Sequence, residues 1–518
     1  EWKKKVVEHF KKHVECFHEE TREKFLATFE WLGPWACSRQ FGLGTKLPFA
    51  QEFLIDSLSD STIYNAYYTI AHLLQGTLNG DKPGLAGLTP DKINDAFFDC
   101  VFLNGPVPEG IDEKLCERFR REFDFWYPVD CRVSGKDLVT NHLTMYLYNH
   151  AAIFPEDKWP IGIRANGHLK LNNEKMSKST GNFLTSSEAI DLFSVTGVRI
   201  GLADAGDGAY AANFDVSVIK SSLSRLASFT EFVKSVVKET NPSGQITHQG
   251  IEGFQDELFS AKLSKIIQET DYSYNRLMFR NALKCAFFDL QNFWTDYVSK
   301  VDSNGISTSL RQDYIENFLL LLTPLIPHYT DYIWRDVLGK QTTIINEKFP
   351  EPKPYNPDVF YMDRLIRKMS DTLRFRVKAL KKVKGLNRAC IFIRTHFNEV
   401  QIHIMRLLKD HFDSEKNEWK PSLNDAINND EYLNNIKKES KNAAQKFMPF
   451  LKFLQDSVPE FGVFLLKEQP EIDQEKLFKD NSAFFLRQLQ GVESIEVFDV
   501  DSGKVDSPLW DDQIANSS

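Results

Sequence analysis

The sequence lacks several features that mark common classes of protein. No uninterrupted apolar run approaches the roughly 20 residues that a membrane-spanning helix needs. The seven cysteines form no C-x-x-C pair, and an odd, scattered set argues against a disulfide framework or a zinc knuckle. No G-x-x-x-x-G-K-[ST] motif occurs, and Gly42 and Gly44 lack the third glycine of a dinucleotide fingerprint. We therefore exclude a P-loop nucleotidase, expect reduced and mostly buried thiols, and expect no metal site.

An excess of positive charge is also missing, because 63 Lys and Arg stand against 72 Asp and Glu, giving a net charge of −9. A large RNA-binding protein can still be acidic overall if its basic residues cluster on one face. With 518 residues, 42% hydrophobic and 26% charged, the chain is long enough for several folded domains. It starts at Glu1 without a Met or an apolar signal core, so we expect an excision from a longer polypeptide.

Apolar periodicity divides the chain into four regions. A helical spacing predicts one long helix over residues 1–32, which Gly33 and Pro34 end. A mixed α/β pattern follows, then a strong 3.6-residue periodicity typical of a helical bundle. Beyond a proline-rich stretch the pattern becomes α+β. We place these regions at residues 1–34, 35–190, 191–349 and 350–518.

Several individual elements are predicted within these regions. N-cap side chains predict a helix over residues 63–74, and Thr185 with Glu188 forms a capping-box signature ahead of another helix. The last region is predicted to contain strands at 390–394, 461–466 and 494–500, a helix at 474–489, and a polar, helix-bearing insertion near 413–443.

The strongest chemical signal is the string K-M-S-K-S at residues 175–179, which Thr180 and Gly181 follow. Two lysines three positions apart act as point charges towards a polyphosphate, and hydroxyls and glycine-freed amides add donors. We interpret the loop as a clamp that stabilises negative charge on a triphosphate as pyrophosphate leaves. The alternative is an ordinary solvated Lys/Ser loop. A related string at 368–371, K-M-S-D, lacks the second lysine and lies in a helical pattern, so we predict an ordinary helix surface there.

The K-M-S-K-S string resembles the second signature of class I aminoacyl-tRNA synthetases. Residues 38–48, S-R-Q-F-G-L-G-T-K-L-P, resemble the segment that re-enters the catalytic domain of this class after its editing insertion. Leu43 and Lys46 depart from the usual pattern there, as in the eukaryotic and archaeal leucyl branch; a glycine-rich turn with a structural arginine is the alternative. Further runs are similar to the cytosolic leucyl branch, at residues 58–64, 125–130, 166–169 and 204–207. In the loop at 208–212, G-A-Y-A-A, we would expect more acidic character, and the contacts of that loop stay open.

The resemblance implies a fold and a set of site residues. The fold is the second half of a Rossmann-like α/β catalytic domain, followed by an α-helical bundle and a small α+β domain. Gly135 has no Cβ, which suits a backbone lying against a ligand, and the Asp137 carboxylate suits hydrogen bonds from ribose hydroxyls. By themselves, Asp137 is more often a helix cap and His142 a core histidine. The resemblance implies catalytic roles for Lys178 and, secondarily, Lys175, and ATP contacts from Met176, Ser177, Ser179, Gly135, Asp137, His142 and His168.

The implied reaction is ATP-dependent activation of leucine, with Mg²⁺ accompanying ATP, and transfer of the leucyl group to tRNA(Leu) in the cytoplasm. An isoleucyl or valyl enzyme, or a non-catalytic tRNA-binding module, is the alternative. The first class I signature, His-x-Gly-His, is nowhere in this sequence, so we expect the chain alone to be inactive. Contacts to tRNA phosphates are expected from the richest basic stretch, with a solvated helix face as the alternative: Arg374, Arg376, Lys378, Lys381, Lys382 and Lys384.

Overall fold

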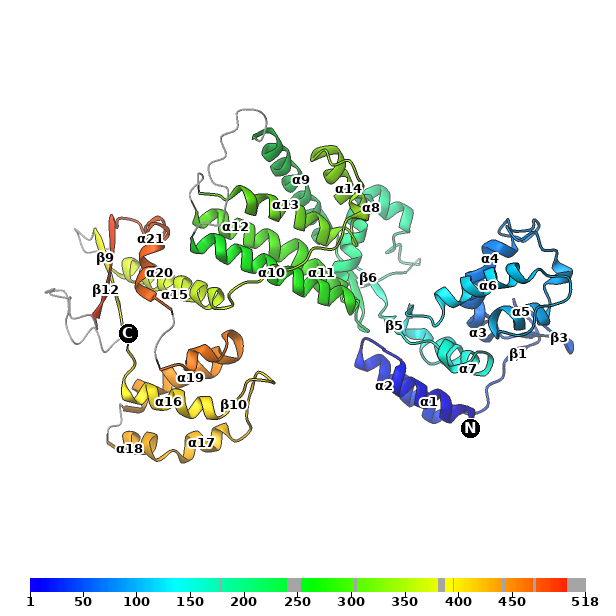
Figure 1. Cartoon of the computed structure of the whole chain (residues 1–518), viewed down its shortest axis with the longest axis horizontal. Coiled ribbons are helices and arrows are strands. Elements are labelled where there is room, and N and C mark those ends of the chain that lie inside the picture. Colours follow the sequence, from blue (N-terminus) through cyan, green and yellow to red (C-terminus); the bar gives the residue numbers. More distant parts are fainter. Residues whose placement is uncertain are drawn as a thin grey trace. The chain divides into compact units, whose positions relative to one another are not determined.

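The computed structural model describes residues 1–177, 179–239, 253–301, 305–380, 387–394, 396–439, 443–468 and 472–500. The chain divides into two compact units, each of which is described by itself (Figure 1). Unit 1 comprises Glu1–Glu231 and Asp271–Lys284, and unit 2 comprises Phe232–Thr270 and Cys285–Ser518. No helix in the described ranges is long and apolar enough to cross a membrane. All seven cysteines are free, and Cys16, Cys100, Cys116 and Cys285 are buried.

Unit 1 combines short strands with helices, as expected for an α/β region. Its helices are α1 (Trp2–His13), α2 (Glu19–Trp31), α3 (Ser57–Asp60), α4 (Tyr64–Leu74), α5 (Asp95–Phe102), α6 (Glu113–Trp126), α7 (His142–Ile153), α8 (Ser186–Ala205), the first part of α9 (Val216–Glu239), the end of α10 (Phe254–Asn275) and α11 (Phe279–Leu283). Its strands are β1 (Ser38–Arg39), β2 (Lys46–Leu47), β3 (Ala50–Ile55), β4 (Arg132–Gly135), β5 (Ile163–Asn166), β6 (Leu169–Leu171), β7 (Glu174–Lys175) and β8 (Ala212–Phe214).

The prediction of one long helix over residues 1–32 is wrong, because α1 ends at His13 and α2 begins at Glu19. Between them the chain is extended, and the amide of Glu15 donates to the carbonyl of Ile161 at 2.9 Å while the Ile163 amide donates to Glu15 at 2.9 Å. This pairing with a distant segment replaces helical hydrogen bonds. The apolar spacing was nevertheless informative, because both helices bury phenylalanines in one cluster with α7.

Two local predictions in unit 1 are confirmed. Helix α4 spans Tyr64–Leu74, after a 3₁₀ turn at Ser61–Ile63. Its predicted N-cap does not form, because no side chain caps either start and the Asp60 carboxylate accepts from Thr45 instead. Helix α8 begins with a complete capping box, in which the Glu188 amide donates to the Thr185 hydroxyl at 3.2 Å and the Thr185 amide donates to the Glu188 carboxylate at 2.8 Å. Two backbone donors at the helix start are satisfied in this way.

Unit 2 is a helical bundle followed by a mixed region, in the order expected. Its helices are the remainder of α9 and α10, α12 (Leu290–Lys300), α13 (Thr308–Leu322), α14 (Pro327–Tyr332), α15 (Asp358–Ala379), α16 (Glu399–Asp410), α17 (Leu423–Asn429), α18 (Glu431–Glu439), α19 (Ala443–Phe461), α20 (Gln474–Asp480) and α21 (Ser482–Gln488). Its strands are β9 (Arg388–Ile393), β10 (Phe412–Asp413), β11 (Glu418–Trp419) and β12 (Ser494–Asp499).

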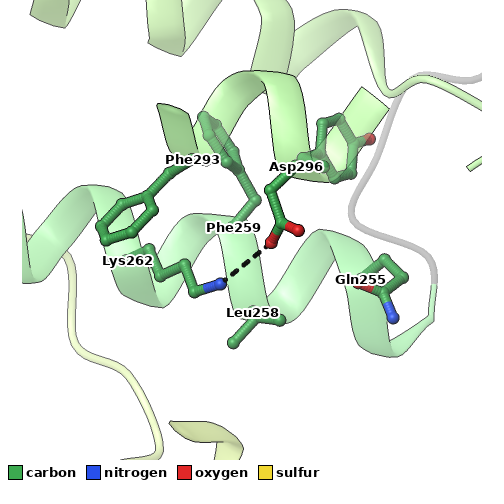
Figure 2. A pocket seen from close by; sticks show the side chains of 7 residues that line it. Gln255, Leu258, Phe259, Lys262, Phe293 and Asp296 are labelled. Carbon is green, nitrogen blue, oxygen red and sulfur yellow. Dashed lines mark hydrogen bonds and ion pairs between the residues drawn. The ribbon is translucent and has the colours of Figure 1, made fainter. Parts of the chain in front are cut away.

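A buried ion cluster joins three helices of unit 2. The Asp363 carboxylate of α15 accepts from Lys262 Nζ of α10 at 3.0 Å and from Lys300 Nζ of α12 at 2.9 Å. Asp296 lies 3.4 Å from Lys262 and 2.7 Å from Arg367. Figure 2 shows the Lys262–Asp296 pair beside the aromatic side chains of a shallow pocket. Lys300, Lys262 and Asp363 are almost fully buried. Removing one of these charges would leave a buried charge without its partner, which destabilises the fold.

The C-terminal region corrects two predictions. Strands β9 and β12 form as expected and pair in parallel, with Arg388 opposite Ser494. The strand predicted at 461–466 is wrong: α19 ends at Phe461, Gly462 has φ of 114°, and a 3₁₀ turn follows at Val463–Leu466. The helix predicted at 474–489 is divided at Asn481, whose buried side chain donates to the Leu477 carbonyl at 2.8 Å and accepts from Gln255 at 2.7 Å.

Candidate active site

The carboxyl ends of two parallel strands bring the predicted adenosine-binding residues together in unit 1. Strands β4 and β5 pair with Gly135 opposite Asn166. The residues that follow each strand therefore meet at one edge, where Asp137 Oδ1 lies 3.7 Å from His168 Nε2. Both side chains are exposed and available to a ligand. Ligands of open parallel sheets bind at this edge, so the register forms a candidate site from residues far apart in the sequence.

Glycines line both sides of this edge. A Cβ on Gly135 would lie 2.7 Å from Asp137 Oδ1, and a Cβ on Gly167 would lie 1.8 Å from the carbonyl oxygen of Tyr210. The Gly167 amide donates to the Gly208 carbonyl at 3.0 Å. The loop at 208–212 thus packs directly against the residue before His168, which identifies contacts that the sequence left open. Position 167 requires glycine, because the Tyr210 backbone occupies the space that a Cβ would take.

His142 lies in the interior rather than at the exposed edge. It is the first residue of α7, its side chain is only 4% exposed, and its ring stacks on Tyr64 with centroids 6.4 Å apart. Burial lowers the pKa of His142, which favours the neutral ring. Its Nδ1 has no hydrogen-bond partner among the described residues. The surroundings are those of a core histidine, and a contact of His142 with nucleotide stays a prediction.

The K-M-S-K-S segment follows the hairpin of β6 and β7. Strand β6 pairs antiparallel with β7 and parallel with β8, and half-buried Met176 packs against the Leu171, Phe214 and Ile219 cluster. Met176 therefore anchors the loop, and its predicted contact with ATP stays a prediction. Strand β7 ends at Lys175, whose side chain is exposed.

A tight turn follows this anchor. The Ser177 amide donates to the Asn182 carbonyl at 3.0 Å, and the hydroxyls of Ser177 and Ser179 are 2.8 Å apart. Gly181 has φ of 73°, a conformation that favours glycine. Lys178 lies outside the described residues, so its catalytic role stays a prediction. The turn presents exposed Lys175 and Ser179 from a hairpin that is fixed at its base.

A buried arginine that the sequence did not single out holds the region behind the site. Arg164 of β5 is 3% exposed, and its Nη2 donates to the carbonyl of Asp207 at 2.7 Å. Asp207 also receives the Arg280 amide at 3.1 Å on its carboxylate, and its carbonyl lies 2.9 Å from His18 Nε2. A lone arginine in a short strand gives no sequence signal, whereas the structure shows that it links β5 to the start of the 208–212 loop.

The segment at 38–48 supplies β1 and β2 to a three-stranded sheet in the order β1-β3-β2, in which β3 is the central strand. Arg39 Nη2 lies 3.3 Å from the buried carboxylate of Asp56, and the Thr45 hydroxyl donates to Asp60 at 2.8 Å. Leu43 is 92% exposed. Arg39 therefore has the structural pairing that the alternative interpretation expected.

The predicted RNA-binding stretch begins in the last two turns of α15. Arg374 pairs with Asp371 one turn earlier, whereas Arg376 and Lys378 are exposed and form no ion pair with any residue that the structure describes. Lys381, Lys382 and Lys384 lie outside the described residues. The related string at 368–371 lies within α15, but only Lys368 and Asp371 are exposed, because Met369 packs against the core and Ser370 is buried.

No group of three or more His, Cys, Asp or Glu side chains in the described parts of the chain is arranged to hold a metal ion. The candidate site combines glycine backbone, one exposed Asp/His pair and a lysine-bearing turn. Such a set of groups can bind a nucleotide and stabilise phosphate charge.

Comparison with known proteins gives matches along nearly the whole chain. The family described as anticodon-binding domain of tRNA ligase matches residues 256–390, and tRNA synthetases class I (M) matches residues 113–241. Cytoplasmic leucine–tRNA ligase of Pongo abelii is 38% identical over 512 residues, which is 96% of this chain and 42% of that protein.

Two further relatives carry the same description. The Arabidopsis thaliana protein is 34% identical, over 96% of this chain and 47% of its own length, and the Saccharomyces cerevisiae protein is 41% identical, over 74% and 35%. The chain thus spans less than half the length of these relatives. The resemblance to the leucyl branch of class I synthetases, inferred from the K-M-S-K-S motif and the runs around it, is confirmed.

Proposed function

We propose that this chain is the C-terminal part of a leucine–tRNA ligase, which activates leucine with ATP and transfers it to the 3′-terminal adenosine of tRNA(Leu). The observation that carries the proposal is the meeting of Gly135, Asp137 and His168 at the ends of β4 and β5, in the unit that bears the K-M-S-K-S turn. The 38% identity over 96% of the chain to a cytoplasmic leucine–tRNA ligase supports leucine as the amino acid and the cytoplasm as the location.

In the proposed mechanism this chain binds ATP and stabilises charge. Asp137 and His168 contact the ribose and the nucleotide, and Gly135 lets the backbone approach the adenosine. Mg²⁺ enters with ATP as part of the substrate. A leucine carboxylate oxygen attacks the α-phosphate, the bond to the β-phosphate breaks, and pyrophosphate leaves towards Lys178 and Lys175. The adenylate carbonyl is then attacked by the 2′-hydroxyl of the terminal tRNA adenosine, and AMP leaves.

On the side of the phosphates opposite Lys175 and Lys178, the proposed mechanism needs groups that this sequence does not contain. His-x-Gly-His occurs nowhere in it, and the relatives are more than twice as long as the matched part. We therefore expect the 518-residue chain alone to be inactive in leucine activation and a polypeptide of the relatives' length to be active. Residues 191–349 would form the helical tRNA-binding bundle, and residues 350–518 a further tRNA-binding domain.

The test is amino-acid-dependent ATP–pyrophosphate exchange by the full-length polypeptide containing this chain, comparing leucine, isoleucine, valine and methionine. We expect exchange to be fastest with leucine. Fastest exchange with another amino acid would leave the proposed mechanism in place and contradict leucine as the substrate. Exchange with none of the four, from a folded protein, would replace the proposal with a non-catalytic RNA-binding role.

A further inference from the structure

One stretch of this acidic chain carries only positive charge. Between Asp371 and Glu399 there is no acidic residue, although the whole chain has a net charge of −9. A local excess of this size creates a strong positive potential whatever the sign of the rest. The stretch contains eight cationic residues: Arg374, Arg376, Lys378, Lys381, Lys382, Lys384, Arg388 and Arg394.

The described start of this stretch is the C-terminal end of α15, where an aromatic ring stands among the cations. Leu373 and Val377 face the core. Phe375 points away from it and is 71% exposed, and no ring contact or cation–π contact joins it to any residue that the structure describes. A single exposed apolar side chain is ordinary. Phe375 is less ordinary, because Arg374 and Arg376 flank it and Lys378 follows one helical turn later.

The two ends of α15 use their cations differently. Near the start of the helix, Arg364 pairs with Glu460 at 3.0 Å and Arg367 lies in the buried ion cluster. Near the end, the described residues give Arg376 and Lys378 no such pair and give Arg374 one partner, Asp371. The cations at the start of the helix are engaged within unit 2, whereas those at the end are exposed towards solvent, where a polyanion can reach them.

We propose that Phe375 is a stacking platform for an unpaired RNA base, with Arg376 and Lys378 contacting the phosphates on either side of it. A flat aromatic face between cations matches a single-stranded nucleic acid, because each nucleotide offers one π-face and one phosphate. Bases stacked within a duplex offer no free face. The inference rests on the proposed function in taking tRNA as the natural ligand. It adds the residue that contacts the RNA, Phe375, and the kind of nucleotide that it contacts, an unpaired one.

The test is equilibrium binding of the purified chain to tRNA, to a short single-stranded RNA containing 2-aminopurine, and to a duplex of the same sequence. Phe375→Ala should weaken binding to the single strand and to tRNA by roughly 5- to 100-fold, the scale of losing one stacking partner. It should also abolish the stacking-induced quenching of 2-aminopurine. Phe375→Trp should retain both, because it keeps the aromatic face.

Salt dependence separates stacking from charge. Phe375→Ala should leave the slope of log K against log salt unchanged, whereas Arg376→Ala should reduce it by about one phosphate contact. The matched control is Phe125→Ala, which removes a ring that is 77% exposed elsewhere on the protein and should change RNA binding less than twofold. Unchanged circular dichroism will verify folding, since Phe375 is not part of the core.

Three outcomes would overturn the proposal: Phe375→Ala binding within twofold of wild type, Phe375→Leu binding as well as wild type, or equal losses for duplex and single strand. The second would indicate a general apolar contact instead of aromatic stacking. Leucine-dependent exchange by the full-length polypeptide needs no tRNA, so a failure here and a failure of the proposed function are distinguishable.

Discussion

Asp137 and His168 face each other across the ends of two parallel strands, with Asp137 Oδ1 3.7 Å from His168 Nε2. Neither residue is near the other in sequence. The β4–β5 register, with Gly135 opposite Asn166, brings them together. Each side chain is largely exposed, so the pair is accessible to a ligand and contributes little as a surface ion pair. We therefore propose a binding role for the pair.

The first prediction concerns this carboxylate. In the full-length polypeptide, Asp137→Ala should raise KM for ATP by roughly tenfold with a smaller effect on kcat, because a hydrogen bond to a charged acceptor contributes about 1.5–3 kcal/mol. Asp137→Asn keeps one acceptor oxygen, so its KM for ATP should lie between those of wild type and Asp137→Ala. Pyrophosphate exchange at varied ATP measures both constants. Equal KM values for wild type and Asp137→Ala would remove Asp137 from the site.

The second prediction concerns the lysine turn. Lys178→Ala should slow adenylate formation by roughly 10²–10³-fold, the effect of losing one preorganised donor to a developing charge. Lys368→Ala is the matched control, since Lys368 is the exposed lysine of the related string in α15. Its rate should stay within twofold of wild type. Rapid-quench measurement of leucyl-adenylate tests both variants, and a Lys178→Ala rate within threefold of wild type would contradict the catalytic assignment.

The third prediction concerns the glycine behind His168. Gly167→Ala would place a methyl group 1.8 Å from the Tyr210 carbonyl oxygen, so backbone must move. We expect a loss of about 1–3 kcal/mol in stability and faster amide hydrogen exchange at 208–212. Gly208→Ala is the control, because a Cβ there meets nothing within 4 Å. Equal hydrogen exchange in the two variants would show that the loop does not depend on Gly167.

The fourth prediction concerns the buried ion cluster. Burial alone would raise the pKa of Asp363, but the ammonium groups of Lys262 and Lys300 lower it to about 2. A carboxylate with a depressed folded-state pKa contributes stability above its unfolded value of about 4, and this contribution is lost as the pH falls from about 4 to about 2.

Asp363→Asn should therefore cost about 3–5 kcal/mol at pH 7, because two buried ammonium groups lose their partner. It should also flatten the acid limb of stability between pH 4 and pH 2. Asp425→Asn removes an exposed carboxylate and should change stability by less than about 0.5 kcal/mol. Urea unfolding at several pH values is the measurement, and parallel pH profiles for wild type and Asp363→Asn would contradict the assignment.

The fifth prediction is a gain of affinity. Asp371 holds Arg374 on the exposed face of α15, so Asp371→Asn should free that guanidinium for phosphate. We expect tighter tRNA binding and a slope of log K against log salt that is steeper by up to about one contact. Lys416→Ala, which removes an exposed cation of another segment, should leave the slope unchanged. Weaker binding by Asp371→Asn would exclude Arg374 from the RNA surface.

Local signals in the sequence were sufficient for several elements. The capping box of Thr185 and Glu188 and the apolar helix at 64–74 depend only on neighbours within a few residues, and both form as predicted. The K-M-S-K-S motif also depends on its own residues, and it indicated the resemblance to leucine–tRNA ligases that the relatives confirm. Such signals do not depend on how the rest of the chain folds.

The tertiary structure decided what depends on distant partners. It interrupted the first helix by pairing Glu15 with the segment before β5, and it replaced a predicted strand at 461–466 with a turn after Gly462. It also placed Asp137 beside His168, packed Tyr210 against Gly167, and assembled the charges around Asp363. The sequence identified which residues carry chemistry because side-chain type is local. Only the strand register and helix packing determined which of them meet, because those contacts join segments that no short-range pattern relates.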